Sequence, residues 1–106
     1  MNLKITGHHL DVTPAIREFT ENKLQRVLKR LDNITEAHCI YSLERNNHQA
    51  EIAVRIPGKE LFCEASDHNL YTAIDALSEK LDRLVSKHKS KQKESLQQGT
   101  KRVHAA

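Results

Sequence analysis

The sequence has few aromatic residues, glycines and prolines. Its 106 residues include no Trp, two Phe, two Tyr, three Gly and two Pro. So few aromatics argue against a reader of single-stranded nucleic acid, because such proteins stack bases on rows of aromatic side chains. No Gly-rich phosphate loop, nucleophile elbow or HExxH zinc motif occurs, so we expect that the protein is not an enzyme.

Long apolar runs are also missing. No stretch approaches the roughly 18 apolar residues of a membrane-spanning helix. The first six residues alternate apolar and polar side chains and lack the apolar region of a secretory signal, so we expect a cytoplasmic protein without a membrane partner. The length is typical of one domain with a single modest core.

Cysteine and histidine offer little metal chemistry. Cys39 and Cys63 are far apart and form no CxxC motif, so we interpret them as reduced thiols in a core. Among seven histidines, His8 and His9 are adjacent, a spacing that suits no tetrahedral zinc site. We expect no cofactor and no metal site.

The net charge is small, but it is unevenly distributed. Seventeen basic and fourteen acidic residues give +3. Residues 1–32 carry +2, residues 33–67 carry −3 and residues 68–106 carry +4. An acidic middle between two basic flanks points to a polyanionic partner more strongly than the net value does.

Six secondary-structure elements are predicted from the hydrophobic pattern. Alternation predicts strands within residues 3–7, 37–43, 50–56 and 61–65. Helical spacing predicts one helix from Pro14, capped by Thr13, to about Asp32. It predicts a second helix after the cap residues Ser66 and Asp67, to about Lys91.

The predicted fold class is α+β. The order β-α-β-β-β-α favours a two-layer sandwich with both helices packed on one face of a four-stranded, mainly antiparallel sheet. This order resembles the double-stranded RNA-binding domain fold. We expect one domain over residues 1–93, and a disordered tail over residues 94–106, where the sequence is polar and without period.

Basic residues recur at helical spacing beside both apolar faces. In the first helix they are Lys23, Arg26, Lys29 and Arg30, and in the second they are Lys80, Arg83, Lys87, Lys89 and Lys91. If the helices are parallel on one sheet, these two basic rows become neighbours and offer charge-assisted donors to phosphate oxygens. The alternative is that each row is only a solvated face that complements a helix dipole. We expect Asp75 and Asp82 to be structural.

Two separated motifs resemble the ribosome hibernation promoting factor family. One is LKITG at residues 3–7, followed by VTPAIRE at residues 12–18. The other is DHNLYTAIDAL at residues 67–77, followed by KLDRL at residues 80–84. The resemblance extends from residue 1 to about residue 93.

The resemblance implies a ribosome-binding protein. Members bind the small ribosomal subunit and its rRNA in the decoding channel, at the mRNA and A- and P-site tRNA positions, and block translation in stationary phase. It implies that the nine basic residues above contact RNA, and that the partner is not DNA. Tyr71, Ala73, Ile74 and Leu77 are interpreted as packing residues.

The tail bears on the branch of the family. Residues 94–106 contain one acidic and two basic residues, whereas the branch that resembles protein Y carries an acidic extension. We therefore expect the short form, which promotes ribosome dimers together with ribosome modulation factor. Three alternatives stay open: a protein Y-type factor that opposes dimers, a generic structured-RNA-binding module, and a protein–protein adaptor linked to sigma-factor regulation.

Overall fold

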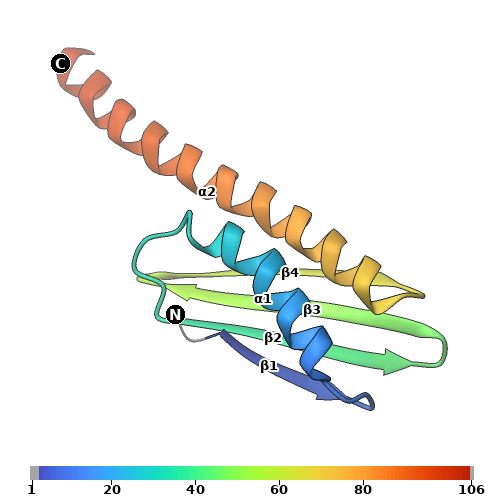
Figure 1. The fold of residues 1–106 in the computed structure, drawn as a ribbon. Helices are drawn as coiled ribbons and strands as arrows, with labels where there is room; N and C mark the ends of the chain where they lie inside the picture. Colours follow the sequence, from blue (N-terminus) through green and yellow to red (C-terminus); the bar gives the residue numbers. More distant parts are fainter. Residues whose placement is uncertain (1–2, 106) are drawn as a thin grey trace.

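Four strands and two helices form a two-layer α+β structure (Figure 1). This computed structural model describes residues 3–105, and side chains as far as Lys91. The elements are β1 (Leu3–His8), α1 (Pro14–Leu28), β2 (Glu36–Glu44), β3 (Asn47–Ile56), β4 (Lys59–Asp67) and α2 (Leu70–Ala105).

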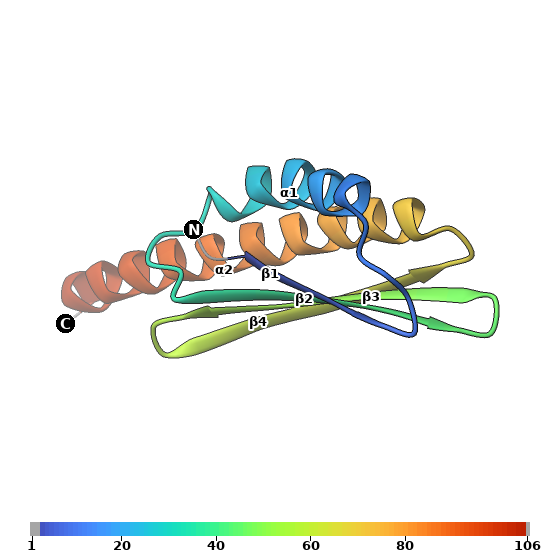
Figure 2. The ribbon, with the colours of Figure 1, turned by 60° about the horizontal axis from the view of Figure 1, so that its bottom comes forward.

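The sheet has the strand order β1-β2-β3-β4. β1 pairs with β2 in parallel, and α1 is the crossover that such a pair requires. The pairs β2–β3 and β3–β4 are antiparallel and joined by short turns. Figure 2 shows both helices on the same face of this sheet. The predicted fold class and element order are confirmed.

Helix α1 begins where the sequence predicts and ends earlier. The hydroxyl of Thr13 accepts a hydrogen bond from the amide of Ile16 at 3.2 Å, and Pro14 occupies the first turn. The helix ends at Leu28 instead of about Asp32. The amides of Arg30 and Leu31 bond to carbonyls three residues back, a tighter turn that closes the helix before the loop to β2.

The β3–β4 turn consists of Pro57 and Gly58 alone, because Ile56 pairs with Lys59. Gly58 has a φ of +75°. A β-turn with proline at its second position and a positive φ at its third favours glycine there. This tight turn places Lys59 at the end of the sheet.

The N-cap of α2 differs from the prediction. β4 continues to Asp67, so Ser66 and Asp67 belong to the strand and its end. The side-chain oxygen of Asn69 accepts hydrogen bonds from the amides of Tyr71 at 2.8 Å and Thr72 at 3.4 Å. Asn69 is therefore the cap, because only its side chain reaches the unpaired amides of the first turn.

The C-terminal end of α2 also differs. The helix continues past Lys91 to Ala105 and projects beyond the sheet (Figure 1). The sequence predicts disorder for residues 94–106 because the hydrophobic periodicity stops there. The helix nevertheless continues as far as Ala105. Residues 92–98 contain three Gln, one Lys, one Glu and one Leu beside one Ser, and the first four residue types favour helix by propensity. The division at residue 93 between domain and tail stays a prediction.

The hydrophobic core lies between the sheet and the helices. Alternate residues of every strand face the helices, as Ala37, Cys39 and Tyr41 do in β2. Each helix adds one apolar face, and both Leu24 and Leu81 have no exposed surface. The core also includes Leu28, Ala50, Ile52, Val54, Ala73, Ile74, Leu77 and Val85, all fully buried.

A buried pair of hydroxyl groups joins α1 to the sheet. The Thr20 hydroxyl donates to the carbonyl of Ile16 at 2.8 Å. Its oxygen lies 2.6 Å from the Tyr41 hydroxyl, which is therefore the donor between the two. Both side chains are fully buried, so the Tyr41 hydroxyl depends on Thr20 for its hydrogen bond, whereas Thr20 also bonds to its own helix.

We predict that Thr20→Val destabilises the fold more than Tyr41→Phe. The first change leaves the buried Tyr41 hydroxyl without a partner and costs about 1–3 kcal/mol, whereas the second removes that hydroxyl and costs about 0.5–1.5 kcal/mol. Urea unfolding of both single variants and the double variant measures these free energies. The double variant should lose less than the two single losses added together; strict additivity would contradict the coupling.

Both cysteines are free thiols on the helix-facing side of the sheet. Cys39 and Cys63 pair with Ile52 from opposite sides. Burial raises the pKa of the Cys39 thiol from 9.0 to about 12, and that of Cys63 to about 11. Burial also raises the pKa of Tyr41. Ionisation of any of these groups therefore favours the unfolded chain.

We predict that the fold loses stability above about pH 9. Because the folded pKa values are raised, the stabilisation is complete below the unfolded pKa of 9.0 and is lost as pH rises towards about 12. Melting temperatures followed by circular dichroism between about pH 7.5 and pH 10.5 test this. Cys39→Ala should show a smaller decrease over the same range. A melting temperature that stays constant to pH 10.5 would count against it.

Candidate RNA-binding surface

The two helices run in the same direction, and two ion pairs set their relative position. The amino group of Lys23 lies 2.9 Å from a carboxylate oxygen of Asp75. Seven residues further along each helix, Arg30 pairs with Asp82. Seven residues are about two helical turns, so the same flank of each helix makes both contacts.

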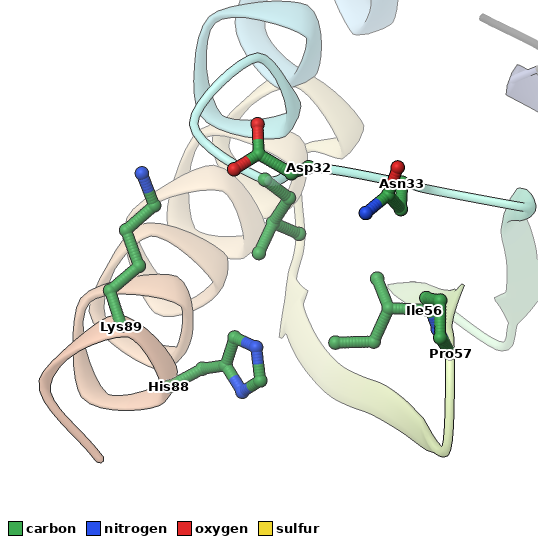
Figure 3. A pocket seen from close by; sticks show the side chains of 7 residues that line it. Asp32, Asn33, Ile56, Pro57, His88 and Lys89 are labelled. Atoms are coloured by element: carbon green, nitrogen blue, oxygen red, sulfur yellow. The ribbon is translucent and has the colours of Figure 1, made fainter. Parts of the chain in front are cut away.

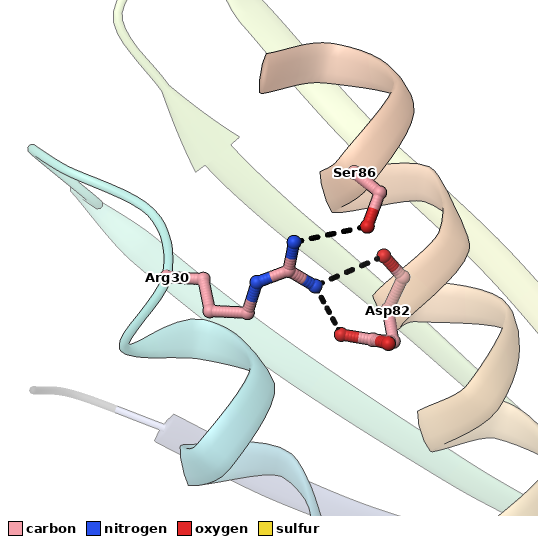
Figure 4. A network of polar contacts seen from close by, with 3 residues as sticks. All are labelled: Arg30, Asp82 and Ser86. Atoms are coloured by element: carbon pink, nitrogen blue, oxygen red, sulfur yellow. Dashed lines mark hydrogen bonds and ion pairs between the residues drawn. The ribbon is translucent and has the colours of Figure 1, made fainter. Parts of the chain in front are cut away.

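Arg30 makes a network with two residues of α2 (Figure 4). One terminal nitrogen donates to the carboxylate of Asp82, and also lies 3.4 Å from its carbonyl oxygen. The other donates to the Ser86 hydroxyl at 2.9 Å. The network is partly exposed, so it sets geometry more than it adds stability.

A groove of about 320 Å³ lies between the helices. Basic and acidic side chains both line it: Lys23, Arg26, Val27, Arg30, Ser78, Glu79 and Asp82. Lys23 and Arg30 form ion pairs with carboxylates of α2. Arg26 is exposed and makes no ion pair with any residue whose side chain is described. Arg26 is thus the member of this row most available to an external anion.

The other flank of α2 faces the edge strand β4. The Lys80 amino group donates to the carbonyl of Glu64 at 2.8 Å, which keeps its positive charge beside the strand. Further along, Lys87, His88 and Lys91 line a hollow of about 300 Å³ together with Lys59. This hollow combines three ammonium groups from two elements with the Glu60 carboxylate and the Phe62 ring of β4.

A third hollow, of about 250 Å³, lies at the end of the sheet (Figure 3). The loop after α1 contributes Asp32 and Asn33, the β3–β4 turn contributes Pro57, and α2 contributes His88 and Lys89. His88 lines this hollow and the neighbouring one, so the two adjoin at its side chain.

The structure separates the two predicted basic rows. Asp75 and Asp82 lie on the flank of α2 that faces α1. Lys80 and Lys87 instead lie beside β4. The expectation of two neighbouring basic rows is therefore wrong, because a line of carboxylates lies between them. The sequence interpretation of Asp75 as structural is confirmed.

The nine predicted residues differ in how free they are. Lys23 and Arg30 are in ion pairs, and Arg83 lies 4.0 Å from Glu79 on its own helix. Among the side chains described, no ion pair involves five exposed members: Arg26, Lys29, Lys87, Lys89 and Lys91. Lys59 lies close to two of them, Lys87 and Lys91. The sequence does not predict this, since nothing in it shows that the turn before Lys59 meets the second half of α2.

The aromatic residues near α1 pack against other side chains of the protein. The Phe19 and Tyr71 rings pack edge to face with centroids 5.0 Å apart. The Lys23 amino group lies 5.6 Å from the Phe19 centroid. Ala73, Ile74 and Leu77 are fully buried, whereas Tyr71 is 42% exposed. The first three are core residues as predicted, and Tyr71 packs at the surface between the helices.

The arrangement suits binding of phosphate groups and offers little else. Lysine and arginine side chains at helical intervals are donors for successive phosphates of a nucleic acid backbone. Among the described residues, no group of three His, Cys, Asp or Glu side chains is placed to hold a metal ion. Within residues 3–105, no helix is long and apolar enough to cross a membrane.

Comparison with known proteins agrees with this chemistry. Residues 3–93 match the family described as Sigma 54 modulation protein / S30EA ribosomal protein. The ribosome hibernation promoting factor of Pseudomonas putida is 40% identical over 97 residues, which cover 92% of this chain and 95% of that protein. The factor of the same name from Escherichia coli K12 is 33% identical over 94 residues, with 89% and 99% covered.

Two solved structures have the same fold. A ribosomal subunit interface protein from Coxiella burnetii superposes with a TM-score of 0.80 at 32% identity, covering 85% of this chain and 99% of that one. The protein Y N-terminal domain of Thermus thermophilus has a TM-score of 0.75 at 36% identity, covering 83% and 99%. The match to a ribosomal protein family agrees with the prediction that the protein is not an enzyme. The chain therefore belongs to the S30EA ribosomal protein family, that of the ribosome hibernation promoting factors.

Proposed function

We propose that this protein binds rRNA of the small ribosomal subunit through the helix layer, in the decoding channel where mRNA and the A- and P-site tRNAs lie. Occupation of these positions blocks translation while the ribosome is preserved in stationary phase. The proposed location is the cytoplasm. The observation that carries the proposal is the set of exposed cations around α2, from Arg26 in the groove to Lys59 and Lys91 beside β4.

The surface suits folded RNA better than single strands. Phe19 and Tyr71 pack edge to face, Tyr41 is buried and Phe62 stands alone, so the four aromatic residues form no row on which successive bases could stack. The basic side chains instead project from a rigid helix at intervals of one or two turns. Donors at fixed spacing match the phosphates of a structured RNA, whose shape sets the spacing of its backbone.

We predict that reversing two charges beside β4 weakens binding to small subunits at least tenfold. Lys87→Glu with Lys91→Glu removes two phosphate contacts and adds repulsion, and the slope of log affinity against log salt should decrease by about 2. Sedimentation with purified small subunits at several salt concentrations measures both quantities.

A matched control reverses two charges elsewhere. Arg17→Glu with Arg45→Glu makes the same change in net charge on exposed residues outside the nine basic residues and the hollow with Lys59. Its affinity should stay within about twofold of the wild type. Equal losses in both double variants would show that only net charge matters, and would contradict a defined RNA-binding surface.

We further propose that the protein promotes ribosome dimers together with ribosome modulation factor. The resemblance to the short family members supports this proposal, as does a segment over residues 94–106 that has two basic residues and one acidic residue. Sucrose gradients of ribosomes with each factor alone and with both should show the most dimers when both are present.

The opposite result would favour the second candidate function. The 36% identity to the protein Y N-terminal domain supports a factor that inactivates single ribosomes. In that case, adding this protein should dissolve dimers formed by ribosome modulation factor. Binding to free duplex RNA in preference to small subunits would instead indicate a generic RNA-binding module. Salt-independent binding to another protein would indicate an adaptor.

A further inference from the structure

The sheet face opposite the helices has no covering element within residues 3–105 (Figure 2). We call it the outer face, and define it by the strand residues that alternate with the buried ones. Its charged members are five glutamates, one lysine and one arginine: Glu36, Glu44, Glu51, Glu60, Glu64, Lys4 and Arg55. With histidines neutral, the outer face carries a net charge of −3.

The arginine of this face is already neutralised. Arg55 lies 3.9 Å from a carboxylate oxygen of Glu36 and 3.6 Å from one of Glu60. These three side chains, with His38 and Ala53, surround a shallow hollow of about 150 Å³. The charge that the outer face offers to an external partner is therefore negative.

Two glutamates of the outer face are placed unfavourably for folding. Glu51 on β3 lies directly opposite Glu64 on β4. Like charges directly opposite each other on antiparallel strands are destabilising. Gln49 donates a hydrogen bond to Glu64 at 3.1 Å, but neither carboxylate forms an ion pair with a described side chain. A lysine at either position would serve the fold better.

An apolar patch lies beside these carboxylates. Phe62 is 50% exposed, and its register partner on β3 is Ala53. It lies on the edge strand, where it also lines the hollow that contains Lys87 and Lys91. Ile40 pairs with Glu51 on the other side of β3 and is half-buried. Apolar centres with charged rims are typical of protein–protein interfaces, and aromatic residues are enriched in them.

The charge decides between possible partners. Phosphates of RNA or of anionic lipid are repelled by the unpaired glutamates, and so is the outer face of a second copy. A lysine- or arginine-rich protein segment is attracted, and its apolar side chains can contact Phe62. Electrostatic complementarity of this kind sets orientation as well as affinity.

We propose that the outer face docks a basic segment of a protein in the small ribosomal subunit, beside the RNA that the helix layer contacts. This inference rests on the proposed function. The two faces of the sandwich then bind partners of opposite charge. Ile40, Glu51 and Glu64 form the centre of the docking surface, and Phe62 forms its edge beside α2.

The test uses a substitution that should raise the melting temperature and lower the affinity for small subunits. Glu51→Lys replaces the repulsion with a cross-strand ion pair to Glu64, so it should raise the melting temperature by about 2–4 °C. It also makes the protein more basic, which strengthens binding to RNA in general. If the outer face docks a basic segment, the added lysine repels that segment. The affinity for purified small subunits should therefore fall about tenfold. Glu51→Gln should weaken binding less.

A matched variant and a cross-link complete the test. Glu18→Lys makes the same charge change on an exposed residue of α1, and its affinity should equal or exceed that of the wild type. A photoreactive phenylalanine analogue at position 40, beside Glu51 on the outer face and outside the hollow with Lys87 and Lys91, should cross-link, within purified small subunits, to a basic ribosomal protein. A Glu51→Lys variant that binds as well as or better than the wild type overturns the inference, and so does a cross-link to rRNA or none at all.

These outcomes separate the inference from the function on which it rests. Wild-type protein that fails to sediment with small subunits overturns both. Wild-type protein that binds, loses affinity on Lys87→Glu with Lys91→Glu, and is insensitive to Glu51→Lys retains the proposed function and overturns only the outer-face proposal.

Discussion

Both amphipathic helices bury their apolar faces on the same side of one sheet, and the other features of the surface depend on this constraint. Since α1 connects two parallel strands, it has to cross the sheet in the direction that brings it alongside α2. The two flanks in contact then need complementary charges. Lys23 with Asp75 and Arg30 with Asp82 provide them two turns apart.

The same constraint divides the charge of the molecule between its faces. Apart from Arg26 in the groove between the helices, the described helix cations that do not pair between the helices lie at the ends and outer flanks of the helix layer, where Lys59 of the sheet joins Lys87 and Lys91. The glutamates of the strands cannot point into an apolar core, so they gather on the opposite face. A small net charge thus conceals two surfaces of opposite sign, and each favours a different class of partner.

Sequence patterns predicted the elements better than their ends. Alternation and helical spacing report burial, and burial exists only where an element meets the core. Past Lys91, α2 leaves the sheet and the apolar period stops, although the helix itself continues on propensity. Likewise, Ser66 and Asp67 are residue types that often cap helices, but it is the Asn69 side chain that accepts the hydrogen bonds of the first-turn amides.

The sequence by itself determined the element order, the fold class, the core residues of each helix and the basic residues at helical spacing, because these follow from periodicity along one chain. Only the tertiary structure decided which cations are free. Lys23 and Arg30 form ion pairs with Asp75 and Asp82, and the β3–β4 turn brings Lys59 to α2. Such pairings depend on how two distant segments are placed on a shared sheet, and no local pattern encodes that placement.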